Sequence, residues 1–255
     1  MKIVVCIKQV PDTTEVKLDP KTNTLIRDGV PSIINPDDKA GIEAALELKE
    51  RLNDGSTVTI VSMGPPQADV ALREALAMGA DEAYLLSDRA FGGSDTFATS
   101  TIIAAGLKKI GYDLVITGRQ AIDGDTAQVG PQIAEHLGIP QVSYAEEIIS
   151  LDNEKAVVKR QFEDRYRILE VPVPCLITAL SELAEPRYMS VHGIYDAYRE
   201  KEVKVLGFED LKDMFDPANI GLKGSPTNVY KSFTKQAKGA GTKYDDVSAD
   251  EAVKI

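Results

Sequence analysis

The chain has 255 residues, of which 43% are hydrophobic, so it is long and apolar enough for one large domain with a sizeable core. Its net charge of −11 argues against nucleic acid as the main partner, and no apolar run approaches the roughly 20 residues that span a bilayer. With two histidines and two cysteines that do not cluster, we expect no metal site.

The sequence begins with a strand pattern. Residues 2–8 have a continuous apolar middle, and three later stretches share this pattern: 57–63, 83–86 and 114–118. Continuous apolar strands predict burial on both faces, as in a parallel sheet covered by helices.

The two cysteines, Cys6 and Cys175, both lie in apolar runs, so we expect them to be reduced and buried. The first residues enter a strand pattern directly, without the layout of a signal peptide. Together these features predict a cytoplasmic protein.

Four helical patterns alternate with the strands, over residues 38–52, 67–78, 95–110 and 126–137. In the first, apolar residues occupy about half of the helical wheel, and the opposite face carries three glutamates, Glu43, Glu47 and Glu50. This alternation predicts an α/β fold with a doubly wound, mainly parallel sheet and helices on both of its faces.

Two segments interrupt the alternation as β-hairpin excursions. Within residues 10–34, the pattern predicts strands at 16–18 and 24–26 around a polar turn. Residues 155–162 and 166–171 predict a second hairpin around a charged turn.

The pattern changes again toward the end of the chain. Residues 175–179 predict one more strand, and the order weakens after Arg199. Residues 219–255 are rich in Gly, Lys, Ser and Asp, which indicates either a disordered tail or an extended arm that orders on a partner. We therefore expect an α/β domain over residues 1–218, followed by a C-terminal arm.

The most informative segment runs from Asp113 to Gly130. An apolar run ends at Gly118, a polar turn follows, and a helical pattern then begins. Such a strand–loop–helix step turns several backbone N–H groups and a helix N-terminus toward one point, which suits a phosphate. Asp125, with Gln128 three residues later, predicts a capping box at the start of the helix.

The acidic residues of this turn restrict how it would bind an anion. Asp123 and Asp125 would repel a phosphate, so the anion would be held mainly by backbone amides and the helix dipole. The glycine spacing matches neither the dinucleotide fingerprint nor the Walker P-loop. From its residues alone, the segment is either a nucleotide-binding loop or an ordinary strand-to-helix turn.

Six segments of the chain form a specific set: 4–12, 34–38, 62–65, 75–81, 118–130 and 185–188. In this order, over about residues 1–220, they resemble the beta subunit of electron transfer flavoproteins. The combination of Ala-Met-Gly-Ala-Asp with Gln-Ala-Ile-Asp is hard to obtain by chance. The family's Asp/Glu-Gly-Gly hairpin turn is replaced here by Glu163-Asp164-Arg165, which lies outside the family's nucleotide site.

The resemblance implies a fold of the adenine-nucleotide-binding type and a heterodimer with an alpha subunit, whose mobile domain carries a redox-active FAD. Ordinary beta subunits bind AMP as a structural nucleotide. In electron-bifurcating members a second FAD takes that place, accepts hydride from NADH, and sends electrons toward ferredoxin or flavodoxin and toward the FAD of the alpha subunit. A further alternative for this chain is an isolated nucleotide-binding sensor domain of similar fold.

Residues 87–96 resemble the bifurcating type. Gly92, Gly93 and Ser94 precede a helix and would let a bulky ring approach the backbone closely. Arg89 would meet a phosphate or stabilise a reduced, anionic flavin. The alternative is a glycine-rich helix entry with an arginine on the surface.

The resemblance also implies the residues of a cofactor site at the carboxyl ends of the parallel strands, where α/β folds bind ligands. No side chain is assigned to acid–base or nucleophilic catalysis, because the chemistry belongs to the flavin. Cys6 is expected to be a wall of the site. Lys8 is either a solvated charge or a neighbour of a phosphate. Asp38 is either a carboxylate that the dipole at the helix N-terminus stabilises or a contact for NADH. Arg119 either neutralises charge on the cofactor or pairs with a nearby carboxylate. The implied site residues are Cys6, Lys8, Asn35, Pro36, Asp37, Asp38, Met63, Gly64, Arg89, Asp95, Thr96, Gly118, Arg119, Gln120, Ala121, Ile122, Asp123, Gly124, Asp125, Thr126, Ala127, Gln128 and Val129.

Residues 185–195 match the family's partner-recognition loop, in which an exposed aliphatic residue anchors to an acyl-CoA dehydrogenase. By position that residue is Val191. With Ile194 and Tyr195 it would form an apolar anchor inside a polar rim. The alternative is a buried connection to the alpha subunit.

Overall fold

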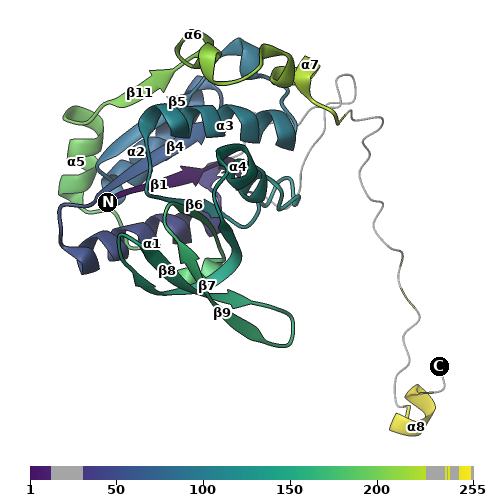
Figure 1. Ribbon diagram of the computed structural model, residues 1–255. Coiled ribbons are helices and arrows are strands. Elements are labelled where there is room, and N and C mark those ends of the chain that lie inside the picture. The colour runs from purple at the N-terminus through teal and green to yellow at the C-terminus, as the bar shows by residue number, and fades with distance from the viewer. Residues whose placement is uncertain (13–30, 228–238, 240, 242–246, 254–255) are drawn as a thin grey trace. The chain divides into compact units, whose positions relative to one another are not determined.

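The computed structural model describes residues 1–12, 31–227, 239, 241 and 247–253. They belong to two units: an α/β unit with the described residues up to Thr227, and a C-terminal unit in which the short helix α8 (Ala249–Ala252) is described (Figure 1). The strands predicted at 16–18 and 24–26 lie outside the described residues. The segments that flank them pair as a two-stranded antiparallel sheet of β2 (Gln9–Pro11) and β3 (Ser32–Ile34).

A nine-stranded sheet forms the centre of the α/β unit (Figure 1). Seven neighbouring strands are parallel, and the last two are added antiparallel, which confirms the predicted mainly parallel sheet. In spatial order the strands are β11 (Val203–Leu206), β5 (Glu82–Leu86), β4 (Thr57–Met63), β1 (Lys2–Ile7), β6 (Leu114–Gly118), β10 (Cys175–Ala179), β7 (Gln141–Leu151), β8 (Lys155–Gln161) and β9 (Tyr166–Pro172).

The order of the strands reverses direction beside β1. The chain runs outward from β1 to β4 and β5, and then crosses to β6 on the other side of β1. In α/β folds, such a reversal opens a crevice at the carboxyl ends of the two central strands, where ligands bind. The end of β1 and the end of β6 therefore mark the expected position of a site.

Helices cover both faces of this sheet, as the continuous apolar strands predict. The side chains of β1 alternate between two core clusters: Ile3 and Val5 pack with Ile42 of one helix layer, whereas Val4 packs with Ile102 of the other. The helices are α1 (Pro36–Leu52) and α2 (Asp69–Met78) on the first face, α3 (Thr96–Ile110) and α4 (Val129–Leu137) on the second, and α5 (Val191–Arg199), α6 (Phe208–Leu211) and α7 (Gly221–Gly224) in the later chain.

One face of α1 differs from its sequence pattern. Glu43 was predicted on the solvent side of this helix, together with Glu47 and Glu50, but its side chain is buried. The reason is an ion pair with Arg187, which lies 144 residues later in the chain. A cation from a distant part of the chain therefore permits a buried carboxylate at a position that helical periodicity alone assigns to the solvent-exposed face.

The later part of the chain is more regular than the sequence indicates. The second hairpin is confirmed as β8 and β9, which are antiparallel. The expected loop around Val191 is instead the start of helix α5, which Ser190 caps by accepting the Gly193 N–H at 2.9 Å. After Arg199, β11 adds to the edge of the main sheet beside β5.

A close approach at Gly130 yields a test of this packing. Gly130 is in the first turn of α4, and a Cβ there would lie 2.6 Å from the Thr117 hydroxyl and 2.8 Å from Thr178 Cγ2. Gly130→Ala should therefore lower the free energy of unfolding by about 1–3 kcal/mol. As a control, Gly124→Ala adds a Cβ that meets nothing within 4 Å, and should change stability by less than about 0.5 kcal/mol. Equal urea midpoints for the two variants would contradict the described packing.

Candidate functional site

One buried carboxylate joins the two central strands at the expected crevice. Asp38, in the first turn of α1, accepts the Lys8 N–H at 2.7 Å just after β1, and the Gly118 N–H at 2.9 Å at the end of β6. A Cβ on Gly118 would collide with this carboxylate, so the close approach requires glycine. Burial raises the pKa of Asp38 to about 7, although both N–H donors oppose the rise.

Asn35 holds the loop that follows β6. Its side-chain amide donates to the Gln120 carbonyl at 2.9 Å and accepts the Ile122 N–H at 3.0 Å. Asn35 is fully buried at the start of α1, and its side chain makes no capping bond to that helix because it is bonded to the loop. The Asn35-Pro36-Asp37-Asp38 segment and the loop after Gly118 are therefore brought together, as predicted.

The two acidic side chains of the loop both have partners. Asp123 accepts the Lys8 ammonium at 2.6 Å, and Asp125 accepts the Gln120 amide at 3.0 Å. Lys8 therefore pairs with the loop while its side chain remains 47% exposed. These bonds weaken the repulsion that the two carboxylates would exert on an anion.

The predicted capping box at Asp125 is wrong. Asp125 and Ala127 have left-handed φ angles of 51° and 50°, so helix α4 begins only at Val129. Gln128 stands at the N-cap without a side-chain capping bond, and its side chain instead accepts the Thr96 hydroxyl at 2.9 Å. The spacing of Asp125 and Gln128 fits a capping box, but the left-handed backbone at Asp125 and Ala127 keeps the helix from starting at Asp125.

The backbone of this turn is suited to an anion. The hydrogen bonds within the described chain do not use the N–H groups of Thr126, Ala127 or Gln128. Ala127 is left-handed and Gln128 is right-handed, with φ −103° and ψ −31°. Such an alternation makes successive N–H groups converge, here at the N-terminus of α4.

Arg119 lies beside the loop and forms a loose ion pair. Its Nε atom is 3.4 Å from Asp37 Oδ2, and neither atom has a hydrogen-bond partner among the described residues. The guanidinium also lies 6.0 Å from the centre of the Tyr144 ring. Burial raises the pKa of Asp37, and the Arg119 charge opposes this rise. Tyr144 comes from β7, far along the chain, and no local sequence signal connects it to the site.

Cys6 lies in β1, next to its last residue. It is buried and free, as is Cys175. Burial raises the pKa of the Cys6 thiol, and the nearby Asp38 carboxylate raises it further. A thiol held in its neutral form is a poor nucleophile, which agrees with the expected passive role.

The residues around Arg89 form a separate group. Arg89 is exposed in a short 3₁₀ helix (Arg89–Phe91), and no hydrogen bond or ion pair of the described chain joins it to the loop after β6. Asp95 caps α3 by accepting the Ala98 N–H at 3.0 Å, and also accepts the Thr227 N–H at 2.9 Å. Among the residues that the structure describes, the Thr96 hydroxyl makes the hydrogen bond that joins this group to Gln128.

Leu222 lies beside Gly93, where the sequence predicts open space for a bulky ring. A Cβ on Gly93 would lie 3.0 Å from the Cβ of Leu222, and the Leu222 N–H donates to the Gly92 carbonyl at 3.1 Å. The open glycine surface that would admit a bulky ring is therefore covered there by residue 222. The remaining predicted residues, Met63 and Gly64, lie at the end of β4 and in the turn after it.

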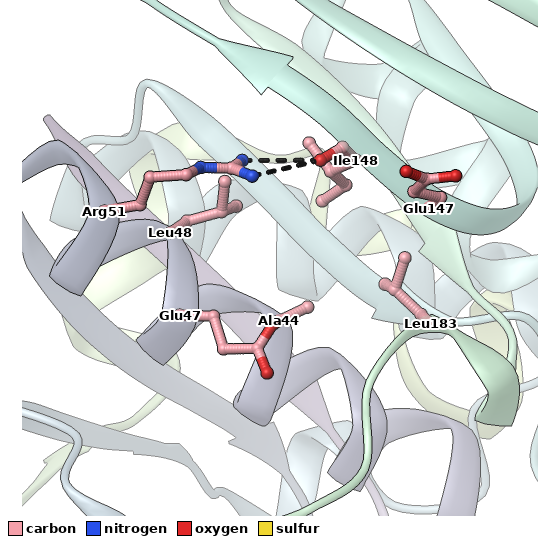
Figure 2. A pocket seen from close by; sticks show the side chains of 7 residues that line it. All are labelled: Ala44, Glu47, Leu48, Arg51, Glu147, Ile148 and Leu183. Atoms are coloured by element: carbon pink, nitrogen blue, oxygen red, sulfur yellow. Dashed lines mark hydrogen bonds between the residues drawn. The ribbon is translucent and has the colours of Figure 1, made fainter.

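A cavity elsewhere in the fold does not coincide with this site. It has a volume of about 190 Å³ and lies between α1 and β7, with Leu48, Ile148 and Leu183 among its lining residues (Figure 2). Figure 2 shows the Arg51 guanidinium donating to the Ile148 carbonyl, at 3.3 and 3.5 Å. The cavity is smaller than the roughly 300–1,000 Å³ of usual ligand pockets, and no predicted site residue lines it.

Comparisons with known proteins cover most of the chain. The model of the electron transfer flavoprotein domain matches residues 22–211. An electron transfer flavoprotein subunit beta of Clostridium acetobutylicum is 61% identical over 96% of this chain and 92% of its own. The caffeyl-CoA reductase-Etf complex subunit CarD of Acetobacterium woodii is 57% identical over 98% and 94%. The acryloyl-CoA reductase electron transfer subunit gamma of Anaerotignum propionicum is 53% identical over 94% and 91%.

None of the helices in the described part of the chain combines the length and the apolar composition that a membrane crossing requires.

Asp38→Asn should change how stability depends on pH. The pKa of Asp38 is raised from 3.8 to about 7 in the folded protein. Between these two pH values, Asp38 therefore keeps a proton in the folded protein that it releases in the unfolded chain. The resulting stabilisation is complete below the unfolded pKa and is lost as the pH rises through about 7. A rise of about three pKa units corresponds to roughly 4 kcal/mol.

Urea unfolding of both proteins between about pH 4 and pH 8 measures this effect. The stability advantage of the wild type over Asp38→Asn should shrink as the pH rises. The contributions of the other carboxyl groups to the pH dependence cancel in this comparison, because those groups titrate in both proteins. A difference that stays constant across this range would show that Asp38 does not titrate as described.

Proposed function

Because this chain belongs to the electron transfer flavoprotein family as a beta subunit, we propose that it binds a FAD between the ends of β1 and β6, in a heterodimer with an alpha subunit. When bound, this FAD supplies the acceptor for hydride from NADH and the branch point for electrons, toward ferredoxin or flavodoxin and, through the FAD of the alpha subunit, toward an acyl-CoA dehydrogenase. The chain itself positions the cofactor and sets its electrostatic surroundings.

The observation that carries the proposal is the uncapped start of α4. The unused N–H groups of Thr126, Ala127 and Gln128 lie where a helix N-terminus favours negative charge. The nearby carboxylates, Asp123 and Asp125, are already bonded to Lys8 and Gln120. A diphosphate group fits this set of donors.

Two cations beside the loop support the same ligand class. The Nε atom of Arg119 is a buried donor without a hydrogen-bond partner among the described residues, although the guanidinium as a whole remains one-third exposed. Lys8 is half-exposed next to Asp123. In the proposal, Arg119 and Lys8 offset cofactor charge, Asn35 and Asp38 hold the loop in place, and Cys6 closes the wall of the crevice.

The bifurcating form of the proposal rests on residues 87–96 and on the names of two relatives. Those relatives are named as electron-transfer parts of a caffeyl-CoA reductase and an acryloyl-CoA reductase, which supports an acyl-CoA dehydrogenase as partner here. Arg89 is exposed and is proposed to act on the flavin or on a phosphate. Asp95 and Thr96 are proposed to hold the adjoining helix start.

An ordinary beta subunit with structural AMP is the second candidate. Leu222 beside Gly93 favours it, because the glycine surface is partly covered and leaves less room for a large ring there. The two candidates differ in composition: the bifurcating heterodimer holds two FAD, whereas the ordinary one holds one FAD and one AMP.

The surface around α5 is proposed to bind the acyl-CoA dehydrogenase. Val191 is 87% exposed and Tyr188 is 99% exposed, and Tyr195, about one helical turn after Val191 in α5, is exposed as well. Apolar and aromatic side chains gathered on a surface are typical of a protein interface. The C-terminal arm, residues 219–255, is proposed to pack on the alpha subunit, and its first part is anchored to α3 through Asp95 and Thr227.

Counting the bound nucleotides of the heterodimer, combined with one variant, tests the cofactor proposal. We expect two FAD and no AMP in the wild type. Gly124→Val should lower FAD occupancy at the beta-subunit site, because the side chain would crowd the loop where the cofactor lies. A Cβ at Gly124 meets nothing within 4 Å in the chain itself, so the fold should tolerate the change. One FAD plus AMP would support the second candidate, and unchanged FAD affinity in Gly124→Val would contradict the placement at this loop.

Val191→Asp tests the docking surface. Burying an aspartate against an apolar partner without a counter-charge is costly, so the KM for the acyl-CoA dehydrogenase should rise at least about tenfold. Flavin content and reduction by NADH should stay as in the wild type. If the variant loses the alpha subunit or its flavins, the surface belongs to the subunit interface instead. If coupling to the dehydrogenase is unaffected, docking occurs elsewhere.

A further inference from the structure

An ion cluster, of which Glu43 is the buried member, connects α1 to the segment that leads into α5. The Glu43 side chain is only 5% exposed, and its carboxylate accepts the Arg187 guanidinium at 2.8–2.9 Å. The same carboxylate accepts the backbone N–H of Arg187 at 2.9 Å. The remaining arm of the guanidinium reaches the exposed Glu50 at 2.7 Å. One arginine is thus fixed by both its backbone and its side chain.

The segment around Arg187 has little else to hold it. Residues 184–190 are neither helix nor strand. Within the described chain, the hydrogen bonds that residues 184–189 make to other elements are those of Arg187. Its neighbours Tyr188 and Met189 are exposed. Among its hydrogen bonds, the path of this segment therefore depends on Arg187, through its backbone N–H and its side chain.

Helix α5 is held independently by α2, at its far end and in its first turn. Arg73 of α2 donates to the Ala197 carbonyl and lies 5.3 Å from the centre of the Tyr198 ring. Gly193 allows α5 to approach the Ala77 carbonyl of α2 closely, because a Cβ there would collide with it. The exposed residues Tyr188 and Val191 thus lie between Arg187, which holds the segment before α5, and the contacts with α2, which begin at Gly193.

We propose that Arg187 is a positioning residue for partner docking. Its bonds to Glu43 and Glu50 set the path of residues 184–190, and so place Tyr188 and Val191 for contact before the partner arrives. The bidentate geometry suits arginine and cannot be reproduced by lysine. A surface ordered in advance loses less conformational freedom on binding, which strengthens the complex. This inference rests on the docking surface of the proposed function.

The test uses the complete heterodimer with purified acyl-CoA dehydrogenase of the same organism, an acyl-CoA as reductant and a redox dye as the terminal electron acceptor, so that electrons cross the docking surface in the reverse direction. Arg187→Gln should raise the KM for the dehydrogenase about tenfold, as expected when the docking segment loses its order, with kcat and flavin content unchanged. Arg187→Lys should recover only part of the loss. Lys49→Gln is the matched control: it removes a cation of similar exposure, 32% against 34%, whose ion pair with Asp81 does not reach the docking segment.

The double variant Arg187→Gln/Val191→Asp separates positioning from a general loss of stability. If Arg187 acts through the placement of Val191 and its neighbour Tyr188, the two substitutions should weaken binding by less than the sum of their separate effects. Additive effects, or an unchanged KM in Arg187→Gln, would overturn the inference. A result in which Val191→Asp itself has no effect would instead contradict the docking surface of the proposed function.

A second variant covers the case in which Arg187→Gln yields no heterodimer. Glu43→Gln keeps a hydrogen-bonding side chain of the same shape and removes only the charge. It should also raise the KM for the dehydrogenase without changing flavin content. An unchanged KM in folded Glu43→Gln heterodimer would overturn the inference.

Discussion

The arrangement of the site depends on one carboxylate with two backbone donors. Asp38 receives N–H groups from the ends of β1 and β6, the two strands between which the sheet reverses its order. This contact brings α1 against β6 and requires a glycine at residue 118. Asn35, three residues earlier, then reaches the loop and holds it. The unused amides before α4 are available because the loop takes this path.

Most of the fold could be predicted because burial on both faces leaves a clear pattern. The ranges of β4, β6 and β10 agree with their apolar runs, and the mainly parallel sheet follows from them. Where a residue distant in the chain determines whether a side chain is buried, local sequence patterns do not predict that burial. Glu43 follows helical periodicity toward solvent, yet Arg187 makes its burial favourable. The short strand β11 was missed because Lys204 interrupts its four residues, so it lacks the continuous apolar run of the central strands.

The site was predicted in part for the same reason. Asn35, Lys8 and the loop after Gly118 lie at strand ends, so their proximity follows from the order of a parallel sheet. The prediction of a capping box failed because the spacing of Asp125 and Gln128 in the sequence carries no information about the sign of φ at Asp125 and Ala127. Tyr144 and Leu222 reach the site region from distant segments, and no spacing within the chain indicates them.

Helix α1 carries both Asp38, which fixes the cofactor loop, and Glu43, which fixes Arg187. Their separation is set by helical geometry, at about 1.5 Å and about 100° per residue. Inserting or deleting one residue between them would turn Glu43 away from Arg187 while Asp38 kept its place. Exposed side chains of α1 that make no ion pair can therefore be exchanged, whereas a change of length between residues 38 and 43 would separate the placement of the cofactor loop from that of Arg187.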